Sequence, residues 1–265
     1  MSEFPERIIC LTEETTEALY LMAEDWRIVG ISGFTVRPAQ ARREKPKVCT
    51  FLEAKIDKIQ ALQPDLILGF SDLQADMARD LVKLGFEVHV FNQRDVAGIL
   101  RMIRMLGGMI GCAQKAERLL AQLQERLDRA RHFAAGLTQR PRVFFEEWDD
   151  PLISSIGWVS ELIEIAGGTL CFPELGAGSL AKDRIIADPN EVIQRAPDII
   201  LGSWCGKPFR PKQVMARPGW SDIPAVVNGH VYEIKSALIL QPGPAALTDG
   251  LDAIVAAITR WQKSR

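Results

Sequence analysis

The sequence predicts an α/β fold with two Rossmann-like lobes joined by a single long helix. Two observations lead to this prediction. Short apolar runs alternate with longer helical patterns along all 265 residues, which is typical of parallel strands linked by helical crossovers. One central stretch, Cys112 to Phe133, contains neither Pro nor Gly and carries leucines at helical spacing.

The first half of the chain alternates strands and helices. Gly85 and the Pro64-Asp65 pair punctuate the pattern, since both residue types interrupt regular structure. We expect strands at 7–11, 27–31, 66–68 and 87–91, and helices at 15–23, 56–62 and 72–84.

The second half repeats this alternation after the central helix. A helix of about 20 residues spans about 30 Å, roughly the width of a small domain. We therefore expect an N-terminal lobe over residues 1–110, a linking helix over 111–138 and a C-terminal lobe over 139–265. In the C-terminal lobe the patterns predict strands at 142–146, 199–201 and 231–234, and helices at 158–166, 190–195 and 245–261.

An internal repeat supports two lobes of related construction. Residues 59–69 (IQALQPDLILG) align without gaps on residues 192–202 (VIQRAPDIILG). Each copy reads as a helix end, a Pro-Asp turn, a buried strand and a glycine. The two copies lie at comparable positions in the two halves.

Composition and charge exclude several classes of function. The formal charge is −2, and no basic stripe indicates a nucleic-acid partner. No apolar run approaches the roughly 20 residues needed to span a bilayer, so we expect no membrane insertion.

Two further features favour the cytoplasm. Met1 to Arg7 lack the features of a signal peptide, and the five cysteines show no disulfide or zinc spacing and read as buried thiols. We therefore expect a cytoplasmic location, or a periplasmic one if a signal peptide precedes this sequence.

The residues that follow the predicted strands form the candidate ligand site. In parallel sheets, ligands bind beyond the carboxyl ends of the strands. Large aromatic side chains are usually buried, so aromatics at several strand exits predict flat apolar walls for a bulky, partly planar ligand. The candidate ligand-binding residues are Phe34, Phe70, Ser71, Glu147, Trp148, Asp149, Trp204, Cys205 and Gln241.

An enzyme is the competing class. Glu146, Glu147, Asp149 and Asp150 form an acidic cluster that could serve a small-molecule hydrolase, and Cys205 could act as a nucleophile with His89 or His230 as base. Phosphate-binding glycine motifs are absent from the sequence. The interpretation we favour is a binding protein without catalytic residues.

At the residues that follow the predicted strands, the sequence resembles the cobalamin-binding class of substrate-binding proteins of ABC importers. This class has siderophore-binding and haem-binding relatives. The resemblance covers nearly the whole chain. The motifs that carry it are Val29 to Phe34 with Pro38, Lys58-Ile59 through Leu68, Glu147 to Pro151, Trp158 to Leu162 with Gly167-Gly168, and Pro197-Asp198.

The resemblance implies a fold of the class III periplasmic-binding-protein type and a corrinoid, cobalamin or a precursor, bound in the cleft between the lobes. It places ring-stacking aromatics at Phe34 and Phe70, with Trp148 and Trp204 as the opposite wall. It implies no intrinsic cofactor, and with only three histidines in the chain we expect no protein ligand to the metal of the bound molecule. Haem or a metal–siderophore complex is the alternative ligand, which Arg37, Arg94 and Arg184 leave open.

The resemblance also implies an ABC permease as partner, on which such proteins dock through one exposed glutamate per lobe. The sequence departs from this pattern. The stretch from Asp72 to Arg79 offers only Asp72 and Asp76, and the stretch from Pro208 to Arg217 is basic. The docking glutamates are therefore not found.

Overall fold

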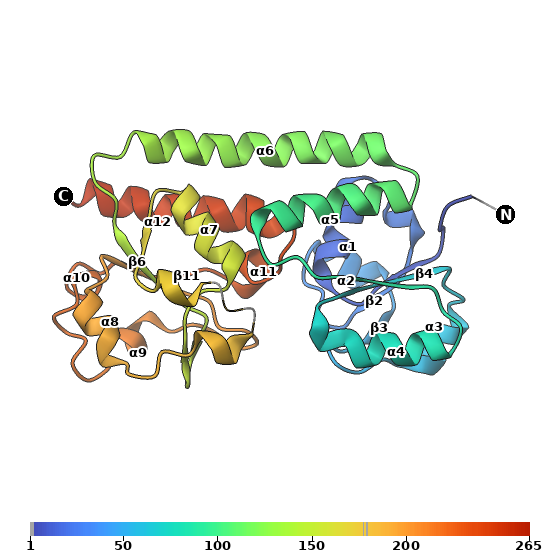
Figure 1. Ribbon diagram of the computed structural model, residues 1–265, viewed down its shortest axis with the longest axis horizontal. Helices are drawn as coiled ribbons and strands as arrows, with labels where there is room; N and C mark the ends of the chain where they lie inside the picture. The colour runs from blue at the N-terminus through green and yellow to red at the C-terminus, as the bar shows by residue number, and fades with distance from the viewer. Residues whose placement is uncertain (1–2, 177, 179) are drawn as a thin grey trace. The chain divides into compact units, whose positions relative to one another are not determined.

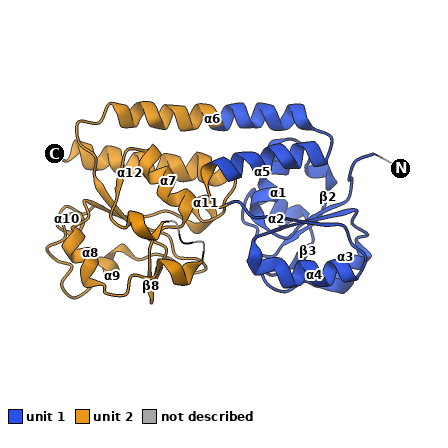
Figure 2. Cartoon of the chain, viewed as in Figure 1, with its two compact units in different colours: residues 1–93, 97–123 blue, residues 94–96, 124–265 orange. Residues whose placement is uncertain are grey.

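The computed structural model describes residues 3–176, 178 and 180–265 (Figure 1). The chain divides into two compact units, coloured separately in Figure 2. Unit 1 comprises residues 1–93 and 97–123, and unit 2 comprises residues 94–96 and 124–265. The boundary between them falls within the longest helix, after Leu123.

Unit 1 is built on a five-stranded sheet in the order β3-β2-β1-β4-β5, in which every neighbouring pair is parallel. Buried aliphatic residues such as Ile9, Ile67 and Leu81 pack against it and form its core. The strands are β1 (Ile8–Cys10), β2 (Ile28–Ser32), β3 (Lys47–Cys49), β4 (Leu66–Phe70) and β5 (Val88–Phe91). The helical segments are α1 (Glu13–Leu21), η1 (Asp25–Arg27), α2 (Ala39–Glu44), α3 (Ile56–Ala61), η2 (Asp72–Gln74), α4 (Ala75–Lys83), α5 (Val96–Met109) and the first part of α6 (Ala113–Ala135).

Unit 2 is built on a four-stranded parallel sheet in the order β11-β10-β6-β9. A short antiparallel hairpin follows β6. The strands are β6 (Arg142–Glu146), β9 (Thr169–Leu170), β10 (Ile199–Gly202) and β11 (Val231–Glu233), and the hairpin pairs β7 (Trp148–Asp149) with β8 (Leu152–Ile153). The helical segments are α7 (Gly157–Ile165), η3 (Pro173–Leu175), η4 (Ala181–Arg184), α8 (Asn190–Arg195), α9 (Pro211–Met215), α10 (Pro224–Val227), α11 (Ser236–Ile239), η5 (Ala246–Gly250) and α12 (Leu251–Lys263).

The two sheets share one strand order. Taken from one edge, β2-β1-β4-β5 of unit 1 corresponds to β9-β6-β10-β11 of unit 2, and β3 has no counterpart. This correspondence, together with the parallel pairing, confirms the predicted α/β class with two Rossmann-like lobes.

The internal repeat has the same structural role in both units. Gln63 and Ala196 both end a helix with a φ of 45°. After each, the aspartate of the Pro-Asp pair accepts a hydrogen bond from the backbone N–H at the start of the neighbouring strand: Asp65 from Arg7 at 2.8 Å, and Asp198 from Arg142 at 2.8 Å. The repeated residues therefore join a helix end to the first strand of each sheet.

An arginine at the start of that strand completes the junction: Arg7 directly precedes β1, and Arg142 is the first residue of β6. The Arg7 guanidinium donates to the carbonyl oxygens of Leu62 and Gln63, and Arg142 donates to the carbonyl oxygen of Arg195 at 3.3 Å. These carbonyls end the preceding helix and have no partner within it, so the arginines satisfy acceptors that would otherwise be unpaired.

The predicted helices and strands are present, with ends that shift by up to a few residues. The sequence reasoning missed β3, the β7–β8 hairpin, β9 and several short helices. These elements have two to six residues, too few for a hydrophobic period to register. None of the helices in the described part of the chain is both long enough and apolar enough to cross a bilayer.

Two adjacent glycines of α5 predict opposite effects on stability. A Cβ on Gly107 would lie 2.3 Å from the Cβ of Ala116 in α6, whereas a Cβ on Gly108 would meet nothing within 4 Å. We therefore expect Gly107→Ala to lower the free energy of unfolding by about 1–3 kcal/mol, because the helices must separate. Gly108→Ala should raise it by about 0.5–1 kcal/mol, because alanine favours the helix. Urea denaturation of both variants measures the difference, and equal shifts would contradict the close helix contact.

Candidate functional site

The carboxyl ends of the parallel strands in unit 1 carry unusually open apolar side chains. Phe34 follows β2, Leu52 follows β3 and Leu73 follows β4, and they are 62%, 63% and 56% exposed. Because all five strands run in the same direction, these three loops emerge at one edge of the sheet. Exposed apolar groups gathered at one edge are typical of a ligand-contacting surface.

The loop that carries Phe34 is held by hydrogen bonds between its backbone and the side chains of Glu13 and Arg42. Glu13 in the first turn of α1 is buried, and its carboxylate accepts a hydrogen bond from the Arg37 backbone N–H at 2.8 Å. The Arg42 guanidinium donates to the carbonyl oxygens of Gly33 and Thr35 at 2.9 and 3.0 Å. Phe34 is therefore an exposed ring on an ordered loop.

Gln74 links two neighbouring loops of the same edge. Its buried side chain accepts from the Phe70 backbone N–H at 3.0 Å and donates to the Phe51 carbonyl oxygen at 2.9 Å. Ser71, which directly follows Phe70, has a φ of 68°. Its hydroxyl accepts a hydrogen bond from the Leu73 N–H at 3.2 Å. The turn therefore directs Leu73 outward while Ser71 itself stays buried.

In unit 2, three of the four acids of the cluster at the end of β6, namely Glu146, Glu147 and Asp149, pair with bases that are distant in the sequence. Glu147 receives both terminal nitrogens of Arg184, at 2.5 and 2.9 Å. Arg184 is fully buried, and it also donates to the Ser154 carbonyl oxygen at 2.6 Å. The pair holds the β7–β8 hairpin against the segment that begins at Arg184.

Glu146, the last residue of β6, is completely buried. It accepts two hydrogen bonds from Arg217, at 2.6 and 2.8 Å, and one from the Trp204 indole N–H at 3.0 Å. Burial raises the pKa of Glu146 above its ordinary value, against the opposing effect of Arg217. The carboxylate anchors the loop that follows β10 to the end of β6.

Lys207 contacts the Asp149 carboxylate and the indole rings of Trp148 and Trp204. Its ammonium lies 2.5 Å from an Asp149 carboxylate oxygen, 4.1 Å from the centre of the Trp148 ring and 4.8 Å from that of Trp204. The Trp148 indole N–H donates to the Asp150 carbonyl oxygen at 2.9 Å. Trp148, Asp149 and Trp204 are thus brought together, as the sequence suggested, but through a lysine that it did not identify.

Two of the four candidate rings are not open, and the expectation that all four lie uncovered at loop tips is wrong. Phe70 is only 7% exposed because it is the last residue of a central strand. Trp204 is 5% exposed because it donates to buried Glu146 and packs edge-on against Phe209, with ring centres 5.0 Å apart. Phe34 is open and Trp148 is half-buried. Ligand contact by any of the four remains a prediction.

Cys205 and Gln241 are the two remaining candidates. Cys205 is an exposed free thiol on the loop after Trp204. Gln241 is partly exposed in the turn after α11, where its carbonyl oxygen accepts from the Gly243 N–H at 2.8 Å.

Several residues that organise the site could not be found from the sequence. Arg184 and Arg217 are separated from their acids by 37 and 71 positions, so no local pattern connects them. Gln74 is one of many polar residues on a helix start. Lys207 alone had a signal, because it lies three residues after Trp204 and directly after Gly206.

The geometry offers little support for the catalytic alternatives. Although Cys205 is exposed as a residue, desolvation of its thiol by neighbouring atoms, followed by the charge of Glu147, raises the pKa of that thiol, which disfavours the nucleophilic thiolate. His230 is engaged by Tyr232 and Ser264 at 2.8 and 2.9 Å. Across residues 3–176, 178 and 180–265, no group of three or more His, Cys, Asp or Glu side chains could hold a metal ion.

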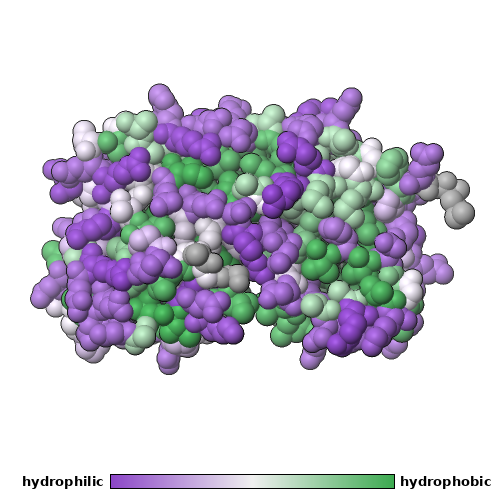
Figure 3. Space-filling view, viewed as in Figure 1, coloured by the Kyte–Doolittle hydropathy of each residue, from purple (hydrophilic) through white to green (hydrophobic). Residues whose placement is uncertain are grey.

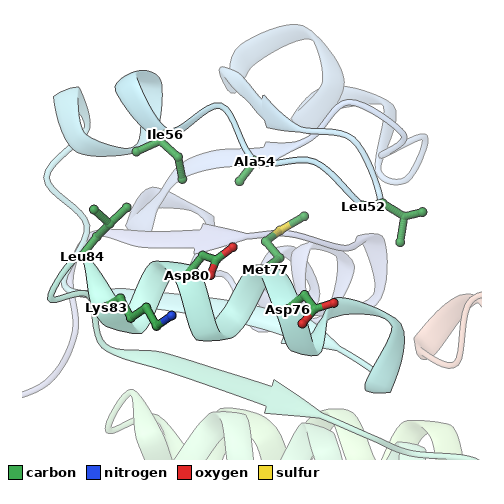
Figure 4. A pocket seen from close by; sticks show the side chains of 8 residues that line it. All are labelled: Leu52, Ala54, Ile56, Asp76, Met77, Asp80, Lys83 and Leu84. Carbon is green, nitrogen blue, oxygen red and sulfur yellow. The ribbon is translucent and has the colours of Figure 1, made fainter.

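A groove of about 450 Å³ lies on unit 1 between α4 and the segment after β3, and it meets the candidate edge only at Leu52. Figure 4 shows Leu52, Ile56 and Met77 at the groove, with Asp76 and Asp80 along α4. The surface view in Figure 3 likewise shows apolar patches among polar groups in this unit. The groove has no aromatic lining, which makes it poorly suited to stack a planar ring system.

Comparison with known proteins gives a consistent result. The model of the family described as "Periplasmic binding protein" matches residues 8–238. The vitamin B12-binding protein of Vibrio parahaemolyticus is 25% identical over 91% of this chain and 86% of its own length. The ABC transporter substrate-binding lipoprotein YvrC of Bacillus subtilis is 23% identical over 96% of this chain and 80% of its own length.

The fold is shared with solved structures of the same type. The periplasmic heme-binding protein RhuT from Roseiflexus superposes with a TM-score of 0.79 at 23% sequence identity, covering 96% of this chain and 99% of that one.

These relatives overturn the expected cytoplasmic location. The matched family consists of periplasmic binding proteins, and one relative is named a lipoprotein, so the homologues point outside the cytoplasm. The expectation depended on Met1 to Arg7 and on the cysteine spacing. Neither feature determines the compartment: the thiols are all free, and four of the five are simply buried core residues.

Glu14, next to the residue that holds the Phe34 loop, predicts a distinctive pH dependence. It is fully buried, and one of its carboxyl oxygens has no hydrogen-bond partner. Burial raises its pKa from an ordinary value of 4.5 to about 7. The folded state therefore binds this proton more tightly than the unfolded chain does, so stability is fully present below about pH 4.5 and falls as the pH rises through about 7.

Glu14→Gln should remove this loss, because the amide carries no charge to desolvate and still accepts from Thr12. At pH 8.5 we expect a free energy of unfolding about 3 kcal/mol above that of the wild type, with a smaller difference at pH 5. Urea denaturation at both pH values is the measurement, with the exposed Glu53→Gln as control. A variant that is less stable at both pH values would refute this interpretation.

Proposed function

Because the chain belongs to the periplasmic binding protein family, we propose that it is a substrate-binding protein whose ligand is a corrinoid, either cobalamin or a precursor such as cobinamide. The observation that carries the proposal is the set of apolar and aromatic side chains at the carboxyl edges of both sheets. Phe34 and Leu52 are open in unit 1, and Trp148 is half-buried in unit 2. A large, partly planar ligand would cover such surfaces, and relatives named vitamin B12-binding protein support the choice.

The positions of the histidines and tyrosines, the side chains that could bind haem iron, favour a corrinoid over haem or a metal–siderophore complex. Haem iron in proteins is commonly held by a histidine or a tyrosine. The three histidines and two tyrosines lie elsewhere in the fold: Tyr20 in α1, His89 inside β5, His132 in α6, and His230 and Tyr232 at the start of β11. None of them directly follows the carboxyl end of a strand.

One of the three arginines that kept haem open also supports this choice. Arg184 is buried in its two-point pair with Glu147, so binding a propionate or a siderophore carboxylate would require breaking that ion pair. Arg37 pairs with Glu17 through its Nε at 3.0 Å, which engages part of its guanidinium. A corrinoid makes no such demand on Arg184.

The family also supports a partner of the ABC permease type, and we propose that the ligand passes to one. The family matches substrate-binding proteins of importers, one of which is named as an ABC transporter component. Asp76, a docking candidate in unit 1, is exposed and pairs with Arg79 at 2.7 Å.

Titration with cyanocobalamin tests the proposed ligand. Binding should quench tryptophan fluorescence through the half-buried Trp148, with saturation well below ~100 μM. Trp148→Ala should weaken binding by about 1–3 kcal/mol while leaving the unfolding midpoint nearly unchanged, because the ring is at the surface of its core.

The matched control is Trp26→Ala. Trp26 is also exposed, but it precedes β2 and so lies at the opposite end of that strand from Phe34. Its removal should leave affinity unchanged. A flat fluorescence response up to ~100 μM in the wild type would reject the corrinoid, and hemin binding under the same conditions would select the alternative.

A further inference from the structure

Lys207 lies at the tip of a loop that is fixed at both ends. Trp204 begins the loop, buried by its bond to Glu146, and Phe209 ends it, packed so closely under Gly202 that a Cβ there would lie 1.8 Å from the ring. Gly206 has a φ of +78°, a conformation that L side chains rarely adopt, and it turns the chain immediately before Lys207. The backbone on either side of Lys207 is therefore anchored by the packing of Trp204 and Phe209.

Three groups converge on the ammonium of Lys207. Asp149 accepts from it at 2.5 Å, and the rings of Trp148 and Trp204 lie at 4.1 and 4.8 Å. A lysine ammonium has three N–H donors and no acceptor, so it can donate to the carboxylate while its charge lies over the two rings. Cation–π contacts at these distances are attractive, and more so where water is partly excluded.

The two rings differ in how they are held. Trp204 is fixed independently, by Glu146 and Phe209. Trp148 lies on the two-residue strand β7, where its ring packs at the margin of the unit 2 core and its indole N–H donates to the Asp150 carbonyl oxygen in its own turn. Lys207 adds a contact to the face of this less firmly held ring.

From this arrangement we propose that Lys207 is a positioning residue for ligand binding. Its ammonium covers one face of the half-buried Trp148 indole and holds the ring in place, so that the part of the ring that stays exposed can stack on a planar ligand. Asp149 neutralises the ammonium and keeps it over the ring. The proposal deepens the function proposed above and rests on it for the identity of the ligand.

The first test needs no ligand. Lys207→Met removes the charge and keeps an unbranched side chain, so the tryptophan emission and near-ultraviolet circular dichroism should change, and Trp148→Phe should abolish most of that change. Lys207→Arg should restore the wild-type spectrum. Lys212→Met, an exposed lysine on α9, controls for net charge. An unchanged spectrum, or a change that survives Trp148→Phe, would overturn the positioning role of Lys207.

The second test uses cyanocobalamin. Lys207→Met should weaken binding about 3- to 30-fold, Lys207→Arg should remain within about 3-fold of the wild type, and Lys212→Met should have no effect. In a Trp148→Ala background Lys207→Met should add no further loss, because the lysine acts through the ring. Equal losses in both backgrounds would overturn the proposal. If the wild type binds no cyanocobalamin, the corrinoid function fails, and the ligand-free spectra alone decide whether Lys207 positions the ring.

Discussion

Parallel pairing of the strands in both sheets is the constraint from which the candidate site follows. Because neighbouring strands run the same way, every loop that leaves a carboxyl end emerges at one edge of its sheet. Residues as far apart in the sequence as Phe34 and Leu73 thereby share an edge in unit 1, and Trp148 and Trp204 share one in unit 2. The repeated Pro-Asp junction supports this pairing in both units, since Asp65 and Asp198 each bind the start of the neighbouring strand.

Charge pairing then determines which side chains at that edge stay open. In unit 2, Glu146, Glu147 and Asp149 are each bound by a different base. The pairs of Glu146 and Glu147 each contain a buried partner, and such pairs contribute little net stability but are costly to break, so they favour one arrangement of the loops. Their consequence here is that an acidic cluster, which in isolation suggests acid–base catalysis or metal binding, serves to hold a tryptophan and a hairpin in place.

Hydrophobic periodicity was sufficient to predict most of the fold, including the long α6 helix and the strands of both lobes. It failed for β3, β9 and the β7–β8 hairpin, which are too short for a period to show. The candidate site was predicted less well. The position of Trp148, Asp149 and Trp204 just after strand ends predicted that these residues lie close together, and all three contact Lys207. The exposure of each ring could not be predicted in this way, because it depends on tertiary partners. The bond from Trp204 to Glu146 spans 58 residues, and no local pattern reveals it.

We propose that ligand contacts lie at the carboxyl edges of both sheets. Hydrogen–deuterium exchange with and without cobinamide tests it directly, because protection reports each loop separately. We expect slower exchange in the loops at 33–38, 50–53, 147–154 and 203–209 when ligand is present. Protection confined to α4, beside the groove of unit 1, or to the loops that precede the strands would contradict it.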